Sequence, residues 1–161
     1  MTHGHPNPFV RMWPDLPWPP PTTNDEHTQT IAKKVWKLAD IKAIARAQLA
    51  RETETLVTPL TESCVADLQK LEFTACDAAE RILELEDHHY DKSTWCMRGV
   101  RAGIKVPDEQ LWFPCDAYAL RIRERLVVTR WEGYVEYYLK LSLTPTKQVI
   151  LLFSFHLPKP F

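Results

Sequence analysis

Glycine and long apolar runs are scarce in this chain of 161 residues. It has only four glycines and no G-x-G, so the phosphate loop of nucleotide-dependent kinases and dehydrogenases is missing. The longest strongly apolar stretch, residues 149–155, is far shorter than the ~20 residues of a transmembrane helix. The N-terminus lacks the basic and then apolar segments of a secretory signal. We therefore expect a cytoplasmic protein that does not interact with a membrane.

Metal-binding motifs are missing as well. No C-x-x-C occurs among the four cysteines, which are 12, 20 and 19 residues apart: Cys64, Cys76, Cys96 and Cys115. Asp87-His88-His89, with Asp91 and Cys96 nearby, offers candidate ligands, but adjacent histidines point in different directions on a helix. A cluster that bonds the carbonyls at a helix end is the simpler interpretation. We expect neither a metal nor another cofactor.

The charge is divided unevenly along the chain. The formal net charge is −1, yet residues 1–90 carry 9 basic and 14 acidic side chains, whereas residues 91–161 carry 11 and 7. The C-terminal half could therefore present a basic surface to a polyanion, although ordinary solvated faces produce differences of this size too.

The N-terminal residues 1–23 read as an extension. Seven of the thirteen prolines lie in residues 1–21, together with Trp13 and Trp18. Because proline fixes φ and has no N–H donor, such a run favours polyproline II or disorder. A flexible tail and a peptide that docks its tryptophans on a surface both remain open. Residues 24–161 are expected to form a single domain.

Helical periodicity dominates the first half of this domain. Apolar residues at spacings of three and four predict an amphipathic helix over about residues 24–50. A second, shorter helix is expected to start near Thr61 or Ser63 and to reach about Gln69. Thr74-Ala75-Cys76-Asp77 resembles a capping box, so a third helix should follow it.

A period of two replaces the helical pattern after residues 96–113, which read as a long loop because of their glycines, proline and scattered charge. Residues 115–123, 134–143 and 148–157 alternate between apolar and polar side chains, as half-buried strands do. Helices followed by consecutive strands indicate an α+β fold, in which N-terminal helices pack on one face of an antiparallel C-terminal sheet.

Four polar side chains of these strands can meet on one face. If the loop after Leu143 has three or five residues, Tyr138, Lys140, Ser154 and His156 share a face, whereas a four-residue loop would separate them. A phenol, an ammonium and an imidazole are the groups that metal-free RNA cleavage needs. They can take the proton from a 2′-OH, stabilise phosphate charge and protonate the leaving oxygen. Surface or packing roles are the competing interpretation.

Arginines alternate along the first of these strands. Arg121, Arg123 and Arg125 fall on one strand face, with Arg130 and Trp131 nearby. Guanidinium and aromatic groups can hold a phosphate backbone and stack on bases. RNA binding and a merely solvated face are both consistent with this pattern.

Four short blocks resemble, in order, the MqsR family of type II toxin–antitoxin systems, over roughly residues 60–157. They are the helix leading into Tyr90-Asp91-Lys92-Ser93, then Asp116-Ala117-Tyr118, Tyr137-Tyr138-Leu139-Lys140 and Leu152-Phe153-Ser154-Phe155-His156. The resemblance implies a RelE-like ribonuclease fold, metal-independent cleavage of single-stranded mRNA and a cognate antitoxin as partner.

The same resemblance implies the catalytic residues. Carried over by position, the family's lysine after a tyrosine is Lys92, which we expect just after a helix, its strand tyrosine is Tyr138 and its C-terminal lysine is His156. Together with Lys140 these residues form the predicted catalytic set. Two departures stand out, since the family's glutamine is Cys115 and its last lysine is a histidine. The alternative is a non-catalytic module on the same fold, which binds an antitoxin or RNA.

Overall fold

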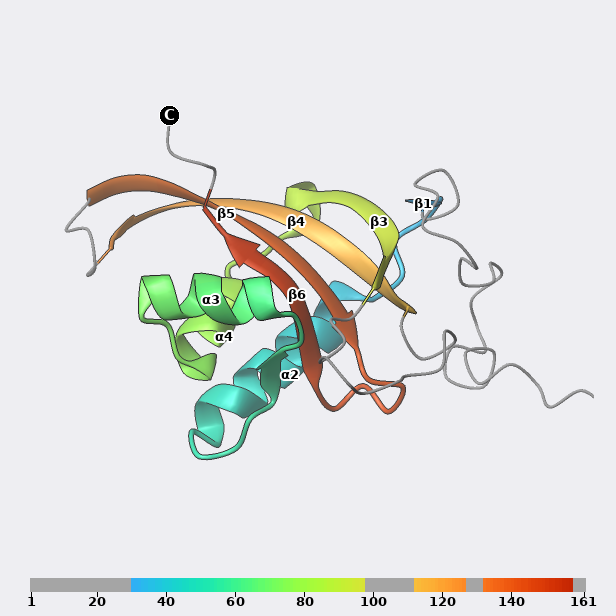
Figure 1. The fold of residues 1–161 in the computed structure, drawn as a ribbon, viewed down its shortest axis with the longest axis horizontal. Coiled ribbons are helices and arrows are strands. Elements are labelled where there is room, and N and C mark those ends of the chain that lie inside the picture. The colour runs from blue at the N-terminus through green and yellow to red at the C-terminus, as the bar shows by residue number, and fades with distance from the viewer. Residues whose placement is uncertain (1–29, 98–111, 127–131, 158–161) are drawn as a thin grey trace, which may run out of the picture.

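The structure is a computed structural model, and it describes residues 30–97, 112–126 and 132–157 (Figure 1). The predicted extension at residues 1–23 and most of the predicted loop lie outside these ranges. The described residues form one six-stranded sheet with three α-helices on one side of it, which confirms the α+β class (Figure 1). We call the opposite side of the sheet the site face.

The sheet has the strand order β1-β3-β4-β5-β6-β2. Its strands are β1 (Thr30–Ile31), β2 (Val57–Pro59), β3 (Tyr90–Met97), β4 (Trp112–Arg125), β5 (Glu132–Leu143) and β6 (Ile150–His156). All neighbours pair antiparallel except β2, which runs parallel to β6. The three strands predicted from alternation are therefore confirmed, whereas the two short edge strands come from the N-terminal half of the chain.

Two of the three predicted helices are confirmed. Helix α3 (Glu62–Leu71) begins after Thr61, whose hydroxyl accepts a hydrogen bond from the Cys64 amide. Helix α4 (Ala75–Leu83) begins with the expected capping box, in which Thr74 and Asp77 each accept a hydrogen bond from the other's backbone N–H.

The first predicted helix was wrong in its N-terminal part. Helix α2 (Leu38–Ala50) starts well after residue 24, and the chain forms β1 and bends before it. The cause lies in β4, where the buried carboxylate of Asp116 accepts hydrogen bonds from the amides of Val35 at 3.0 Å and Trp36 at 2.8 Å. Ser93 donates to the same carboxylate. These bonds hold the segment before α2 against the sheet.

The predicted loop at residues 96–113 was too long at both ends. Cys96 and Met97 belong to β3, and Trp112 and Phe113 belong to β4. The two strands pair as far as Met97 with Trp112, so sheet hydrogen bonding continues where charge and glycine had indicated a loop.

The core lies between the helices and the sheet. Tyr137 and Phe155, both fully buried, point to this side and stack against Phe73, which lies between α3 and α4. The half-buried Arg81 of α4 bonds Glu124 of β4 at 3.2 Å, and Tyr137 donates to the same carboxylate. The helix layer thus anchors the strands that carry the site face.

Candidate functional site

The strand register brings the four predicted catalytic residues together on the site face. Lys92 of β3 lies opposite Ala117 of β4, Ala117 lies opposite Lys140 of β5, and Lys140 lies opposite Ser154 of β6. The next row of the same face holds Ala119, Tyr138 and His156. Paired strands are about 4.8 Å apart, so the two lysines lie about 10 Å apart at the backbone, across a small alanine. Their long side chains can reach one phosphate.

A β-bulge creates this arrangement. The loop after Leu143 comprises residues 144–149, an even number, and our sequence argument held that an even-length loop would separate the four side chains. Leu141 pairs with Leu152, however, whereas Lys140 pairs with Ser154, so β6 carries one extra residue. That residue, Phe153, packs against Phe113, with 5.6 Å between ring centroids. Its carbonyl accepts a hydrogen bond from Thr61.

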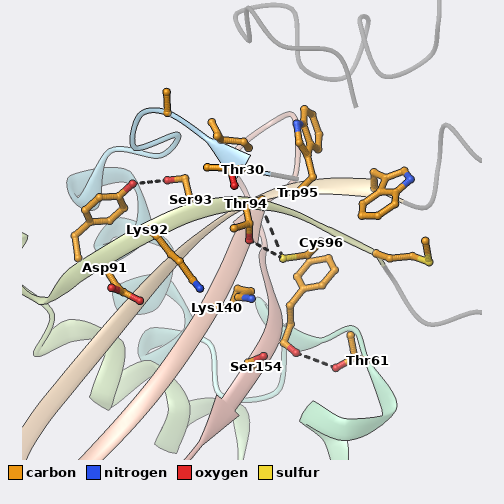
Figure 2. Close-up of a pocket in the computed structure, with 16 residues that line it drawn as sticks. Thr30, Thr61, Asp91, Lys92, Ser93, Thr94, Trp95, Cys96, Lys140 and Ser154 are labelled. Carbon is orange, nitrogen blue, oxygen red and sulfur yellow. Dashed lines mark hydrogen bonds between the residues drawn. The ribbon is translucent and has the colours of Figure 1, made fainter. Parts of the chain in front are cut away.

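A cavity of about 930 Å³ opens on the site face beside the lysines. Figure 2 shows Lys92 from β3 and Lys140 from β5 projecting into this hollow, with Asp91 and Ser154 on its border. The cavity lining includes neither Tyr138 nor His156. The lysines therefore sit in the hollow, and the two ring side chains form its continuation one row further along the sheet.

Tyr138 and His156 lie side by side, with 5.5 Å between their ring centroids. Burial and then the nearby carboxylate of Asp91 raise the pKa of the Tyr138 phenol above its usual value. Tyr138 therefore keeps its proton at neutral pH and can donate it. The Nδ1 atom of His156 lies 3.0 Å from the carbonyl oxygen of Leu157. Because a carbonyl only accepts, this contact places the proton on Nδ1 and leaves Nε2 to exchange protons.

The three predicted RNA-binding arginines are exposed and continue the same face along β4. Arg121 lies opposite Glu136, and its guanidinium covers the ring of Tyr134 at 4.8 Å. Arg123 and Arg125 follow at alternate positions. From Ala117 to Arg125 the strand extends about 27 Å at ~3.3 Å per residue, which is long enough to follow several nucleotides.

The surroundings of Lys92 and His89 differ from those predicted from the sequence. Lys92 is exposed as expected, but it lies within β3 and not just after a helix, because a 3₁₀ turn at Asp87–His89 leads directly into the strand. In that turn His89 accepts a hydrogen bond from the amide of Glu86 through Nδ1, which differs from the predicted bonding to helix-end carbonyls. Within the described ranges, no group of three or more His, Cys, Asp or Glu side chains is arranged to hold a metal ion.

The structure adds residues that the sequence argument missed. Asp91 contacts Tyr138, and Thr94 and Cys96 follow Lys92 on the same face of β3. No strand had been predicted there, because the stretch around Lys92 shows no alternation of apolar and polar residues. The family resemblance had identified residues 90–93 but not the side chains that the fold places around them.

Comparisons with protein-family models, with curated proteins and with solved structures find no match for this chain. In the part of the chain that the structure describes, no helix has the length and apolar character to cross a membrane.

Proposed function

We propose that the protein is a metal-independent endoribonuclease that cleaves single-stranded mRNA through attack of the 2′-OH, and that it acts as the toxin of a toxin–antitoxin pair. The observation that carries the proposal is the register of β3 to β6, which gathers Lys92, Lys140, Tyr138 and His156 on one face. The toxin role and the antitoxin partner rest on the resemblance to the MqsR family.

The geometry suggests a division of roles. The ammonium groups of Lys92 and Lys140 stabilise the phosphate as it gains negative charge. Nε2 of His156 takes the proton of the 2′-OH or returns one to the leaving 5′-oxygen. The protonated phenol of Tyr138 supplies a donor beside it. The arginines of β4 hold the RNA on one side of the scissile bond, where β4 continues beyond the catalytic residues.

The second candidate function is a non-catalytic module that binds an antitoxin or RNA through the same face. Cys115 favours it, since the residue that resembles the family's glutamine is a fully buried thiol with no amide to offer to RNA. The two candidates differ in one measurable property, namely whether the RNA chain is cut.

The test is cleavage of a labelled single-stranded RNA by the purified protein in the presence of EDTA. We expect products with 2′,3′-cyclic phosphate ends, and no cleavage of the DNA of the same sequence, which has no 2′-OH. Lys92→Ala should reduce the rate by ~10²–10³, the usual loss for one positioned electrostatic group. Lys70→Ala is the matched control, because Lys70 is exposed on α3, away from the site face.

Two results would refute the proposal of a metal-independent endoribonuclease. A strict requirement for a divalent metal would remove the 2′-OH mechanism with these four groups. RNA binding without cleavage, together with loss of binding in Lys92→Ala, would support the non-catalytic module.

A further inference from the structure

Two thiols lie next to each other on the site face. Thr94 of β3 pairs with Cys115 of β4, so Cys96, two residues along, is the diagonal neighbour of Cys115. Cys96 is half-buried and lines the cavity (Figure 2), whereas Cys115 is fully buried and is not part of the cavity lining. The Thr94 hydroxyl lies 3.4 Å from the Cys96 sulfur. The half-buried thiol can therefore donate to the carbonyl of Thr94 at 3.9 Å, and as a thiolate it can accept from the Thr94 hydroxyl.

The charges around Cys96 favour its thiolate. The pKa of Cys96 is lowered to about 7, chiefly by a hydrogen bond from Cys115. The charges of Lys140 and Lys92 lower it further. Burial opposes them. Tyr138 also faces this thiol, and its pKa is raised in part by Cys96. Cys115 itself has a pKa far above the usual value, chiefly because of burial, so it stays a thiol and a donor.

Cys115 has one proton and two acceptors. Its sulfur lies 3.6 Å from the carbonyl oxygen of Phe113, which competes with Cys96 for that proton. Ionisation of Cys96 decides the competition, because a hydrogen bond to a charged acceptor is the stronger one. Cys115 is thus a positioning residue, which acts through Cys96 without touching a reactant.

A disulfide between the two cysteines does not fit this geometry. Diagonal neighbours on antiparallel strands are ~7–8 Å apart, whereas the Cα atoms of disulfides are usually ~4.4–6.8 Å apart. A small molecule that enters the cavity can reach Cys96 without any movement of the strands.

We propose that Cys96 is a modification site, at which its sulfur, held beside Cys115 and the lysines of the cavity, forms a mixed disulfide with an acidic low-molecular-weight disulfide. The thiolate attacks one sulfur of R–S–S–R, a Cys96–S–S–R bond forms, the original S–S bond breaks, and R–S⁻ leaves and is protonated by water. The lysines attract the acidic R group, which then occupies the hollow between them. If the proposed function holds, this modification blocks RNA at the same site and a thiol reductant restores it.

The experiment uses oxidised glutathione with the full-length protein and follows each cysteine by peptide mass spectrometry. At pH 7, a thiol with a pKa of about 7 is ~50-fold more ionised than a thiol with a pKa of 9.0, and its lower intrinsic nucleophilicity offsets ~10-fold of this difference. We therefore expect the lowered pKa to speed the reaction of Cys96 ~5-fold, and Cys76, which is also half-buried, serves as the internal control.

Two variants separate this site from an ordinary accessible thiol. Cys115→Ala should move the midpoint of the pH–rate profile upward and slow the reaction at pH 7 by ~5-fold. Lys140→Ala should slow glutathione disulfide more than cystamine, whose charge is positive, because only the acidic reagent is attracted by the lysine.

Several outcomes would overturn the proposal. They are equal rates at Cys96 and Cys76, an unchanged pH profile in Cys115→Ala, and an internal Cys96–Cys115 disulfide in place of the mixed one. If the modified protein binds RNA as tightly as the reduced protein does, the modification does not block the RNA site. Protein that is modified at Cys96 but binds no RNA in either form would count against the proposed function alone.

Discussion

Among the polar residues of the sheet, truncation of Asp116 should lower the free energy of unfolding most. In Asp116→Ala the part-buried amide of Val35 and the buried amide of Trp36 lose this acceptor, while Ser93 can still bond the hydroxyl of Tyr90 at 2.5 Å. A fully buried donor left unsatisfied costs ~1–3 kcal/mol and a part-buried one costs less, so the two together cost at most ~6 kcal/mol. Removal of a buried carboxylate offsets part of this loss. We expect the free energy of unfolding to fall by about 2–4 kcal/mol.

The matched control is Asp116→Asn. Its amide oxygen can accept from Val35 and Trp36, while its NH₂ group donates to Ser93, so the same contacts persist without a charge. This variant should stay within ~1 kcal/mol of the wild type in urea denaturation followed by circular dichroism. If Asp116→Ala is as stable as Asp116→Asn, the carboxylate does not hold the segment before α2, and our account of the shortened helix fails.

The pH dependence of the same pair gives a second check. Burial raises the pKa of Asp116 above its ordinary value of 3.8, against the hydrogen bonds from Ser93, Val35 and Trp36 that lower it. The folded protein therefore holds this proton at a higher pH than the unfolded chain. The resulting stabilisation is fully present below the unfolded pKa and is lost as the pH rises through the folded pKa. Asp116→Asn cannot titrate, so it should gain stability relative to the wild type as the pH rises above about 4.

Three further predictions follow from the site face and the helix layer. His156→Ala should cut the rate of RNA cleavage in a single-turnover assay but leave RNA affinity intact, and His156→Lys should extend activity to higher pH, because an ammonium keeps its proton further than an imidazole does. If His156→Ala cleaves RNA as fast as the wild type at neutral pH, Tyr138 or Lys140 must protonate the leaving oxygen instead. Arg123→Ala should weaken RNA binding and reduce the slope of log K against log[salt] by ~0.7, as measured by fluorescence anisotropy, and an unchanged slope would place the RNA elsewhere. Thr74→Ala should remove ~1 kcal/mol from the free energy of unfolding in urea, and no loss would mean that the capping box contributes nothing.

Part of the candidate site could be predicted because side-chain direction along a strand is a local property. The alternation around Lys140 and around Ser154 places successive side chains on opposite faces, so the members of each strand were correctly grouped. The relation between the two strands was not local. It depended on a loop length and on the bulge at Phe153, and these two deviations cancel.

Strand β3 shows the same limit. Its polar residues give no alternation from which a strand could be predicted, and its pairing with β4 needs partners 15 to 28 residues away. Lys92 was therefore named by resemblance, while its position beside Ala117 and the contact of Asp91 with Tyr138 came only from the folded structure.

Several elements are defined by interactions within their own short segments, so they could be predicted from the amino-acid sequence. Thr74 and Asp77 cap α4 from within one turn of chain, and the apolar periods of β4, β5 and β6 are intrinsic to those segments. Tertiary structure alone decided where α2 begins. Residues 30–37 carry apolar side chains at helical spacing, yet the carboxylate of Asp116, eighty residues away, takes up the amides of Val35 and Trp36. Leaving the buried carboxylate without donors would cost more free energy than one further turn of helix would contribute. Only the folded chain brings the carboxylate and these amides together.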